Sequence, residues 1–320
     1  MSQMTYLIVM SISNLRHNDK LSKSIENILS FLKIMPRHGG NSKNPAVFFN
    51  DIKVSIAIID LSGKKPIMGG CDMNEFIYPA SLYKIYVAAE VLRQVENKTI
   101  NLNKKITISK INAVDKIKQM PYDREKLLKA GDKENIGRLL KLMLSRSDNT
   151  AANCLIDLVG RENINKNIIK KYHWQRSEIT RKFIPRKFEK KKWRKSPITQ
   201  TCARHIAEFL FLVEKGKMLS KTASRNLKKF LSVGKHFEDN NIGAGLPKSA
   251  KFYRKGGWFE SRLKDGSILK FNSDAGIVED GNVKYIIAIL TSLKAKSHKK
   301  TFPMKKLSKA IYDFISGKNY

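Results

Sequence analysis

A serine and a lysine stand three positions apart in the stretch "YPASLYKIYVAAEVL", residues 78–92. Residues three apart on a helix share a face, so the amine of Lys84 can reach the hydroxyl of Ser81. Burial or a nearby cation lowers the pKa of a lysine, and the neutral amine can then remove the proton of the serine. The apolar residues that follow Lys84 favour such burial. The pair alone is a weak signal, because the same spacing recurs by chance at Ser30 and Ser232.

A second polar cluster, Ser147-Asp148-Asn149, lies between two segments with helical hydrophobic spacing. At such a junction a hydroxyl and a carboxamide can face a cleft while Asp148 caps the next helix. The alternative is an ordinary N-cap cluster, because serine, aspartate and asparagine all favour the position before a helix.

A third candidate is Lys255 in the stretch "YRKGGWF", residues 253–259. Two glycines follow the lysine on what is expected to be an edge strand, where glycine lets a ligand approach the backbone closely. The alternative is a glycine turn beside one of many lysines.

Hydrophobic periodicity indicates the elements that must position these residues. Strands are expected within residues 51–63 and between about 250 and 292, and helical spacing dominates from about 86 to 232. Two more helices are expected, at 20–35 and 303–316. Strands at both ends and helices in the middle predict one mixed lobe around a sheet, with the helical part inserted. The expected bounds are 21–85 with 236–320 for the mixed lobe and 86–235 for the helical lobe, after an N-terminal segment 1–20.

Charge is the unusual property of this 320-residue chain, which has 62 Lys and Arg against 28 Asp and Glu, a formal net charge of +34. Such a surface attracts polyanions. The densest run, residues 181–195, mixes basic residues with three aromatics that could stack on bases. The charge is nevertheless spread over most of the chain and no nucleic-acid-binding motif accompanies it, so specific nucleic-acid binding is not expected.

Cysteines and the chain start add little chemistry. Cys71, Cys154 and Cys202 are too widely spaced for a disulfide framework or a metal site, and Cys154 is interpreted as a buried apolar thiol. The short apolar stretch 6–12 has no basic residue before it and no typical cleavage site after it, so the N-terminal segment is at most a degenerate signal peptide.

Together, the three motifs in this order resemble those of the penicillin-recognising serine hydrolases, and most closely the class A β-lactamases. The stretches "IAIIDLSG", "SRSDNTAANCLIDLVG", "NSDAGIV" and "VKYIIAILTS" are similar to that family's opening strand pair, central segment and closing strands. The resemblance implies an α+β, β-lactamase/transpeptidase-like fold, in which an antiparallel sheet is flanked by terminal helices and carries an inserted all-helical lobe.

The resemblance also implies a role for each motif residue. Ser81 would be the nucleophile that forms an acyl-enzyme with a β-lactam or D-alanyl amide, and Lys84 its general base. Ser147 would relay the proton to the leaving nitrogen. The backbone N–H groups of Ser81 and Trp258 would form the oxyanion hole. The residues that would bind the substrate are Asn149, Lys255, Gly256, Gly257 and Trp258.

Two departures from the family pattern are visible. Gly256 stands where the family usually has a hydroxyl residue that grips the substrate carboxylate, and Arg254 and Arg262 are candidates to replace that contact. The loop that should hold a water-activating glutamate contains only Glu178 and Glu189, and neither lies in the family's E-x-x-L-N pattern. Glu189 is the better candidate for the base. If neither serves, the acyl-enzyme would turn over slowly.

Three functions therefore stay open. β-Lactam hydrolysis is favoured, a peptidoglycan D,D-peptidase or penicillin-binding protein with slow deacylation is second, and an inactive member that binds polyanions through residues 181–195 is third. No cofactor or metal is implied. The expected partners are a β-lactam or D-alanyl peptide and an anionic cell-envelope polymer, and a monomer is expected. The resemblance implies a periplasmic or extracytoplasmic location.

Overall fold

The computed structural model describes residues 12, 15–34, 52–116, 126–231 and 241–318. Contacts between residues divide the chain into two compact units. The first unit comprises residues 1–80, 202–211 and 235–320, and the second comprises 81–201 and 212–234. Of the N-terminal segment 1–20, residues 1–11, 13 and 14 lie outside the described residues. No helix in the described ranges is long and apolar enough to cross a bilayer.

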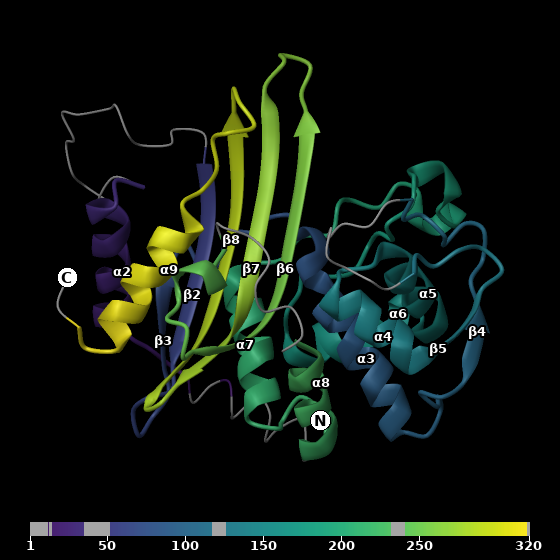
Figure 1. Cartoon of the computed structure of the whole chain (residues 1–320), viewed down its shortest axis with the longest axis horizontal. Coiled ribbons are helices and arrows are strands. Elements are labelled where there is room, and N and C mark those ends of the chain that lie inside the picture. Colours follow the sequence, from purple (N-terminus) through teal and green to yellow (C-terminus); the bar gives the residue numbers. More distant parts are fainter. Residues whose placement is uncertain (1–11, 13–14, 35–51, 117–125, 232–240, 319–320) are drawn as a thin grey trace. The chain divides into compact units, whose positions relative to one another are not determined.

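The first unit is built on a six-stranded sheet with the order β1-β3-β2-β8-β7-β6 (Figure 1). All of its neighbouring strands pair antiparallel except β1, which pairs parallel with β3. The sheet is therefore antiparallel, as predicted, apart from this two-residue edge. The strands are β1 (Arg16–His17), β2 (Ile52–Asp60), β3 (Ile67–Cys71), β6 (Lys251–Arg262), β7 (Ile268–Asp280) and β8 (Val283–Ala295).

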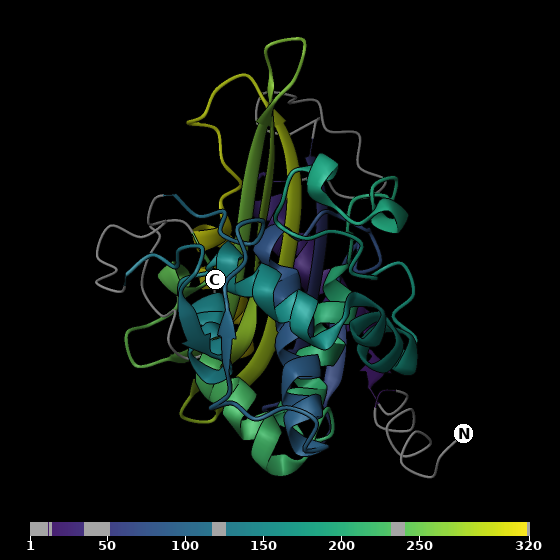
Figure 2. The ribbon, with the colours of Figure 1, turned by 90° about the vertical axis from the view of Figure 1, so that its right-hand side faces the viewer.

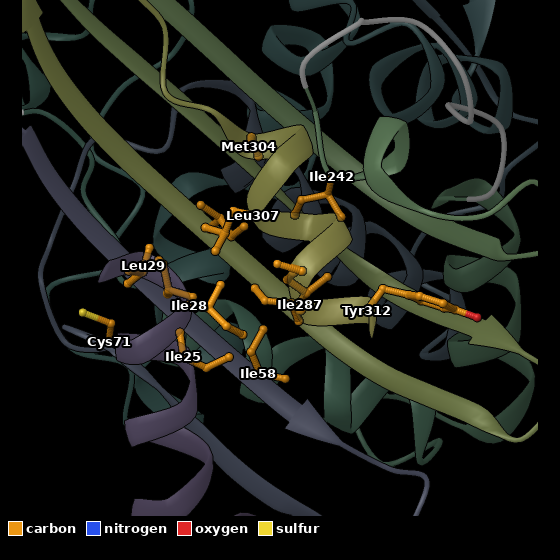
Figure 3. Close-up of a cluster of buried hydrophobic side chains, with 14 of the residues drawn as sticks. Ile25, Ile28, Leu29, Ile58, Cys71, Ile242, Ile287, Met304, Leu307 and Tyr312 are labelled. Carbon is orange, nitrogen blue, oxygen red and sulfur yellow. The ribbon is translucent and has the colours of Figure 1, made fainter. Parts of the chain in front are cut away.

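Two terminal helices, α2 (Asp19–Phe31) and α9 (Met304–Ile315), lie on the same face of this sheet (Figure 1). Their apolar stripes meet alternate residues of β2 and β8 in one buried cluster, which Figure 3 shows around Ile287. Gly69 lets α2 approach closely, because a Cβ there would lie 2.8 Å from Leu21 Cγ. The predicted helices at 20–35 and 303–316 and the predicted strand within 51–63 are thus confirmed.

The second unit is mainly helical (Figure 2). Its helices are α3 (Lys84–Glu96), α4 (Ile136–Ser145), α5 (Asn149–Val159), α6 (Arg161–Ile164) and α8 (Lys221–Leu231), whereas α7 (Ala203–Glu214) belongs to the first unit as far as residue 211. Short helical turns add to these: η1 (Ala80–Tyr83), η2 (Asn165–Ile169), η3 (Lys170–Tyr172), η4 (Arg186–Phe188), η5 (Lys191–Trp193) and, in the first unit, η7 (Gly243–Gly245).

The predicted inserted lobe is not entirely helical. Strands β4 (Lys105–Thr107) and β5 (Lys133–Asn135) form a two-stranded antiparallel ladder in the second unit. Each has only three residues and Ile106 is the single apolar one among them, so hydrophobic alternation could not reveal them. The predicted end of α5 is confirmed, since Gly160 caps it with a φ of +81°.

Candidate active site

Ser81 lies in η1, a short 3-10 turn that leads directly into α3. The turn begins after Pro79, and Ala80 adopts a φ of +47°, a left-handed conformation that costs a non-glycine residue about 1 kcal/mol or more. Ser81 is partly exposed, whereas residues 82–92 behind it are all buried. The backbone thus presents a serine hydroxyl at the accessible end of a buried helix.

The Lys84 side chain is completely buried, one turn beyond Ser81. Its Nζ donates hydrogen bonds to the carbonyl oxygen of Ser147 at 2.5 Å and to Oδ1 of Asn149 at 2.8 Å. A longer contact of 3.3 Å joins it to the Ser147 hydroxyl. The ring of Phe183 covers the same amine, with 4.2 Å from Nζ to the ring centre. The first two motifs therefore meet at one amine.

Burial lowers the pKa of Lys84 to about 7, although the charges of Asp115 and Asp148 act to raise it. About half of the amine is then neutral at pH 7. A neutral amine has two N–H groups, which match the two carbonyl-type oxygens, and a lone pair that can accept a proton from a hydroxyl. Among the described residues the Ser147 hydroxyl is within 3.3 Å of the amine, and the structure records no hydrogen bond between Ser81 and Lys84.

The Ser-Asp-Asn loop is shaped by its aspartate. Asp148 caps α5 by accepting the Ala151 N–H at 2.6 Å, which confirms the predicted cap, and Arg146 holds its other oxygen at 2.8 Å. Ser147 takes a φ of +61°. With Asp148 turned into the protein, the residues on either side of it are the ones that contact the Lys84 amine.

Asp115 is a site residue that the sequence analysis missed. Its carboxylate accepts the backbone N–H of Asn149 at 2.6 Å, the side-chain amide of Asn149 at 3.0 Å and the N–H of Thr150 at 3.0 Å. These bonds place a negative charge at the N-terminus of α5, where the helix dipole favours it. They also orient the Asn149 amide so that its oxygen meets Lys84. No motif links Asp115 to Asn149, so no spacing signal could have found it.

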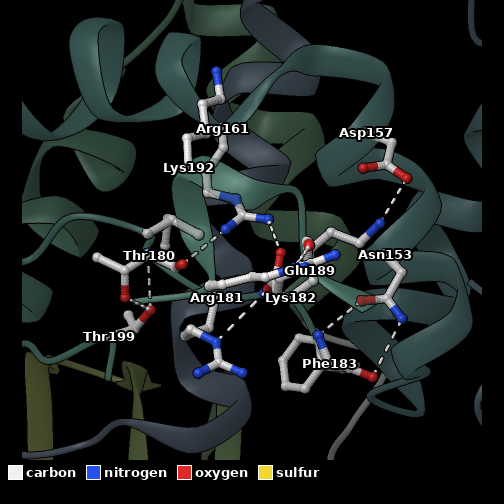
Figure 4. Close-up of polar contacts among 12 residues, drawn as sticks. Asn153, Asp157, Arg161, Thr180, Arg181, Lys182, Phe183, Glu189, Lys192 and Thr199 are labelled. Carbon is white, nitrogen blue, oxygen red and sulfur yellow. Dashed lines mark hydrogen bonds and ion pairs between the residues drawn. The ribbon is translucent and has the colours of Figure 1, made fainter. Parts of the chain in front are cut away.

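Glu189 lies in a buried ion-pair network (Figure 4). One of its oxygens accepts from Arg161 at 2.8 Å, and the other accepts from the backbone N–H of Lys182 at 2.8 Å, with Nε of Arg181 at 3.6 Å. Both oxygens of this buried carboxylate already accept a hydrogen bond, and the Arg161 charge stabilises the ionised form, so the carboxylate is held in place and is less free to take a proton from water. The arrangement argues against the expected role of Glu189 as the deacylation base.

The same loop places Phe183 over the Lys84 amine. The N–H of Phe183 donates to Asn153 at 2.8 Å, and the preceding Lys182 bonds Asp157 at 2.7 Å (Figure 4). The Phe183 ring stacks on Tyr83, with 5.2 Å between ring centres. The amine is thus capped by an aromatic ring. Within the described part of the chain, no carboxylate oxygen contacts this amine directly.

The third motif lies on β6, the edge strand of the described sheet in the first unit, as predicted. Lys255 is buried, with 4% of its surface exposed, and its Nζ donates to the Gly256 carbonyl at 2.6 Å. Gly257 is partly buried, whereas Trp258 is 63% exposed. An edge strand leaves backbone N–H groups that no neighbouring strand takes, which a substrate can use.

Among the described residues, no group of three or more His, Cys, Asp or Glu side chains is arranged to hold a metal ion. The three cysteines are free and buried, as interpreted for Cys154. Burial raises the pKa of the Cys154 thiol to about 11, so it is a poor nucleophile.

Comparison with known proteins decides the family. The sequence model of Beta-lactamase2, the beta-lactamase enzyme family, matches residues 46–315. The chain belongs to this family. No curated protein matches it.

Solved structures show the fold of this β-lactamase family member. PBP-A superposes with a TM-score of 0.71 at 17% identity, covering 95% of this chain and 98% of its own. A class A β-lactamase from Bacteroides cellulosilyticus gives 0.71 at 18% identity, covering 93% and 99%. A PBP-A variant, solved as an acyl-enzyme complex with penicillin G, gives 0.71 at 16%, covering 94% and 98%. The fold is β-lactamase/transpeptidase-like, and the chain is a serine β-lactamase-like hydrolase.

Proposed function

We propose that Ser81 is the nucleophile of this hydrolase and that β-lactams acylate it with Lys84 as the general base. The observation that carries the proposal is the buried Lys84 amine, which is bonded to Ser147 and Asn149 of the Ser-Asp-Asn motif and has its pKa lowered to about 7. A lysine in bulk water would be almost entirely protonated at this pH and useless as a base.

Each proton transfer in the proposed acylation has a donor and an acceptor in the site. The neutral Lys84 amine takes the proton of the Ser81 hydroxyl, and the serine oxygen attacks the β-lactam carbonyl carbon. When the ring C–N bond breaks, Ser147 gives its proton to the leaving nitrogen and takes one from the Lys84 ammonium, 3.3 Å away. The amine ends neutral and the product is an ester on Ser81. Asn149 would hold the substrate.

We further propose that the ester is hydrolysed slowly. An aromatic ring caps the Lys84 amine, and Glu189 is engaged by Arg161 and the Lys182 amide. Missing general-base assistance costs roughly 10²–10⁴-fold in rate. The same arrangement favours the second candidate function, a D,D-peptidase or penicillin-binding protein. The PBP-A variant solved as an acyl-enzyme complex with penicillin G is a precedent for such an adduct on this fold.

Intact-mass spectrometry with penicillin G tests both parts. The expected result is a single penicilloyl adduct on the wild type that persists for minutes, and none on Ser81→Ala with its thermal unfolding unchanged. Labelling of Ser81→Ala would refute the assignment of the nucleophile. Decay of the adduct within seconds would refute slow deacylation and favour a competent β-lactamase.

A separate observation supports a polyanion-binding role for the basic loop, residues 181–195. Glu189 is buried, and the Arg161 guanidinium lies over the Trp193 ring, 4.4 Å from its centre. Glu189 and Trp193 thus anchor the loop to the rest of the protein. The exposed side chains are almost all basic: Arg186, Lys187, Lys190, Lys191, Lys192, Arg194 and Lys195. We propose an anionic polymer of the cell envelope as the partner, with the protein outside the cytoplasm.

Salt-dependent binding to long-chain polyphosphate tests this role. Replacing Lys187, Lys190 and Lys191 by Gln should weaken binding and reduce the salt dependence of the affinity by about three charges. The matched control replaces three exposed lysines elsewhere: Lys64, Lys65 and Lys110. Equal losses in both triple variants would show only the general effect of the net charge.

A further inference from the structure

One carboxylate serves three guanidinium groups in and beside the basic loop. Glu189 accepts a hydrogen bond from Arg161 at 2.8 Å and makes an ion pair with Nε of Arg181 at 3.6 Å. Burial lowers the pKa of Arg181, and the charges of Arg186 and Arg161 lower it further, so the three guanidinium groups repel one another. Three positive charges against one negative charge leave this cluster with a surplus of positive charge.

The polar hydrogens of the cluster are not all used. Among the described residues, Nε of Arg161 and Nε of Arg181 are buried without a hydrogen bond. The other nitrogens of Arg161 donate to Glu189 and to the Thr180 carbonyl, the latter at 2.7 Å. Arg181 differs, because its side chain is 15% exposed and the outer end of its guanidinium is turned away from Glu189 (Figure 4). The donors that a ligand can reach therefore belong to Arg181.

Arg186 supplies a second guanidinium that a ligand can reach, and the loop holds it in place. Its Nη1 donates to the backbone carbonyls of Arg194 at 3.1 Å and Ser196 at 3.3 Å. The side chain is exposed, and no carboxylate in the part of the chain that the structure describes is paired with it. One oxyanion can bridge two such groups, because a phosphate has several oxygens and each guanidinium carries paired donors.

The same segment carries the aromatic cap of the Lys84 amine. Phe183 follows Arg181 by two positions, and its ring lies over Nζ of Lys84. Tyr83 donates its hydroxyl hydrogen to the Arg181 carbonyl at 3.2 Å, and the Tyr83 ring stacks on Phe183. Repulsion at Arg181 therefore acts on the segment that covers the amine. An anion that offsets this repulsion would stabilise the covered arrangement.

We propose that Arg181 and Arg186 form a binding site for a phosphate-like oxyanion, and that the bound anion holds residues 181–183 in place over the Lys84 amine. The site takes one anionic group at a defined position, which distinguishes it from the general attraction of the exposed lysines for a polymer. An anionic polymer would place one of its phosphate groups here. The effect on the acyl-enzyme rests on the proposed acylation of Ser81, whereas the binding of the anion does not.

Thermal unfolding in inorganic phosphate, compared with sodium chloride of equal ionic strength, tests the site. The wild type should melt about 2–4 °C higher in saturating phosphate. Arg181→Gln should lose this increase, and so should Arg186→Gln, which serves if the first variant is too unstable to measure. Lys187→Gln removes an exposed charge from the same loop and should keep the increase. A wild type that melts no higher in phosphate, or an undiminished increase in both arginine variants, overturns the site.

Long-chain polyphosphate distinguishes a polymer from the free anion. In the wild type it should act at a concentration of phosphate groups about tenfold lower or less, because neighbouring lysines contact further groups of the same chain. Replacing Lys187, Lys190 and Lys191 by Gln should remove this advantage and leave the effect of inorganic phosphate. Equal potency of the two compounds on the wild type would identify the free anion as the ligand of the same site.

The lifetime of the penicilloyl adduct tests the effect on the cap. Saturating phosphate should lengthen this lifetime about fivefold or more in the wild type and leave it unchanged in Arg181→Gln. An unchanged wild-type lifetime alongside the thermal shift overturns the effect on the cap. A wild type that penicillin G does not acylate overturns the proposed function instead, and the thermal shift then still decides whether the anion site exists.

Discussion

Replacing Asp115 by asparagine should make the protein acylate faster in mildly acidic solution. The reactive form of Lys84 is the neutral amine, and its pKa of about 7 gives a wild-type acylation rate that rises with pH and levels off above about pH 8. The negative charge of Asp115 raises this pKa. Asp115→Asn removes the charge, so the pKa of Lys84 falls and the rate profile moves to lower pH.

The size of the shift follows from the hydrogen-bond path between the two groups. Lys84 Nζ lies 2.8 Å from Asn149 Oδ1, and Asn149 Nδ2 lies 3.0 Å from Asp115 Oδ1. With the width of an amide group added, the charges are at most about 8 Å apart. Coulomb's law at an effective dielectric constant near 20 gives about 2 kcal/mol. Because Asp115 is partly exposed, we expect about half of this, or roughly 0.5–1 pH unit.

The assay is the second-order rate constant for labelling by a fluorescent penicillin between pH 5 and 9. At pH 6, Asp115→Asn should be about three to six times faster than the wild type, and the two should agree within about twofold above pH 8. Asp132→Asn removes the same charge from an exposed position and is the control. A wild-type profile that is flat from pH 6 to 8, or a variant whose midpoint stays or rises, would refute Lys84 as the titrating base.

Three further substitutions separate catalytic from structural roles. Glu189→Gln should lower the free energy of unfolding, measured by urea titration, by about 3 kcal/mol, because it breaks a buried ion pair with Arg161. The lifetime of the penicilloyl adduct, measured by mass spectrometry, should stay the same. A tenfold longer lifetime would restore Glu189 as the base. Phe183→Glu places a carboxylate beside the Lys84 amine, where it can act as a general base in deacylation, and should shorten the adduct lifetime about 100-fold or more. An unchanged lifetime would mean that slow turnover does not arise from the aromatic cap over the amine. Lys84→Met should abolish acylation. At Lys84 the unfolded chain binds more protons than the folded one above pH 7, whereas the three buried thiols favour the folded, protonated form above about pH 9. Wild-type stability should therefore rise with pH between 7 and about 9, and this slope should be weaker in Lys84→Met.

Much of this protein can be predicted from local pattern alone. Hydrophobic spacing predicted α2, α9 and β2, because each element buries one stripe or both faces, and the Asp148 cap followed from N-cap chemistry. The meeting of Ser147 and Asn149 with Lys84 was expected from the order of the motifs, and the structure shows their contacts with the amine. Each element and each motif is recognised from residues that are close together in the sequence, whereas the meeting of the motifs followed from the family resemblance.

The remaining site residues depend on tertiary contacts between distant segments. Asp115 meets Asn149 across 34 positions, and neither residue has a sequence signature for the other. Phe183 reaches Lys84 because the loop is fixed by Asn153 and Asp157, and a single sequence gives no spacing rule for that. Gly256 was recognised as a departure from the family pattern, but its neighbour, the Arg254 guanidinium 2.5 Å from where a Cβ would lie, is visible only in the folded strand.

The pairing of β2 with β8 has a consequence for how the protein is made. Ile56 lies opposite Ile289 in the ladder, so the central pair of the sheet joins segments from near the two ends of the chain. A ribosome synthesises β8 long after β2, and until then the hydrophobic β2 segment can pair only with β3. Closure over so long a loop is slow. We therefore expect the nascent chain to depend on chaperones until β8 has been synthesised.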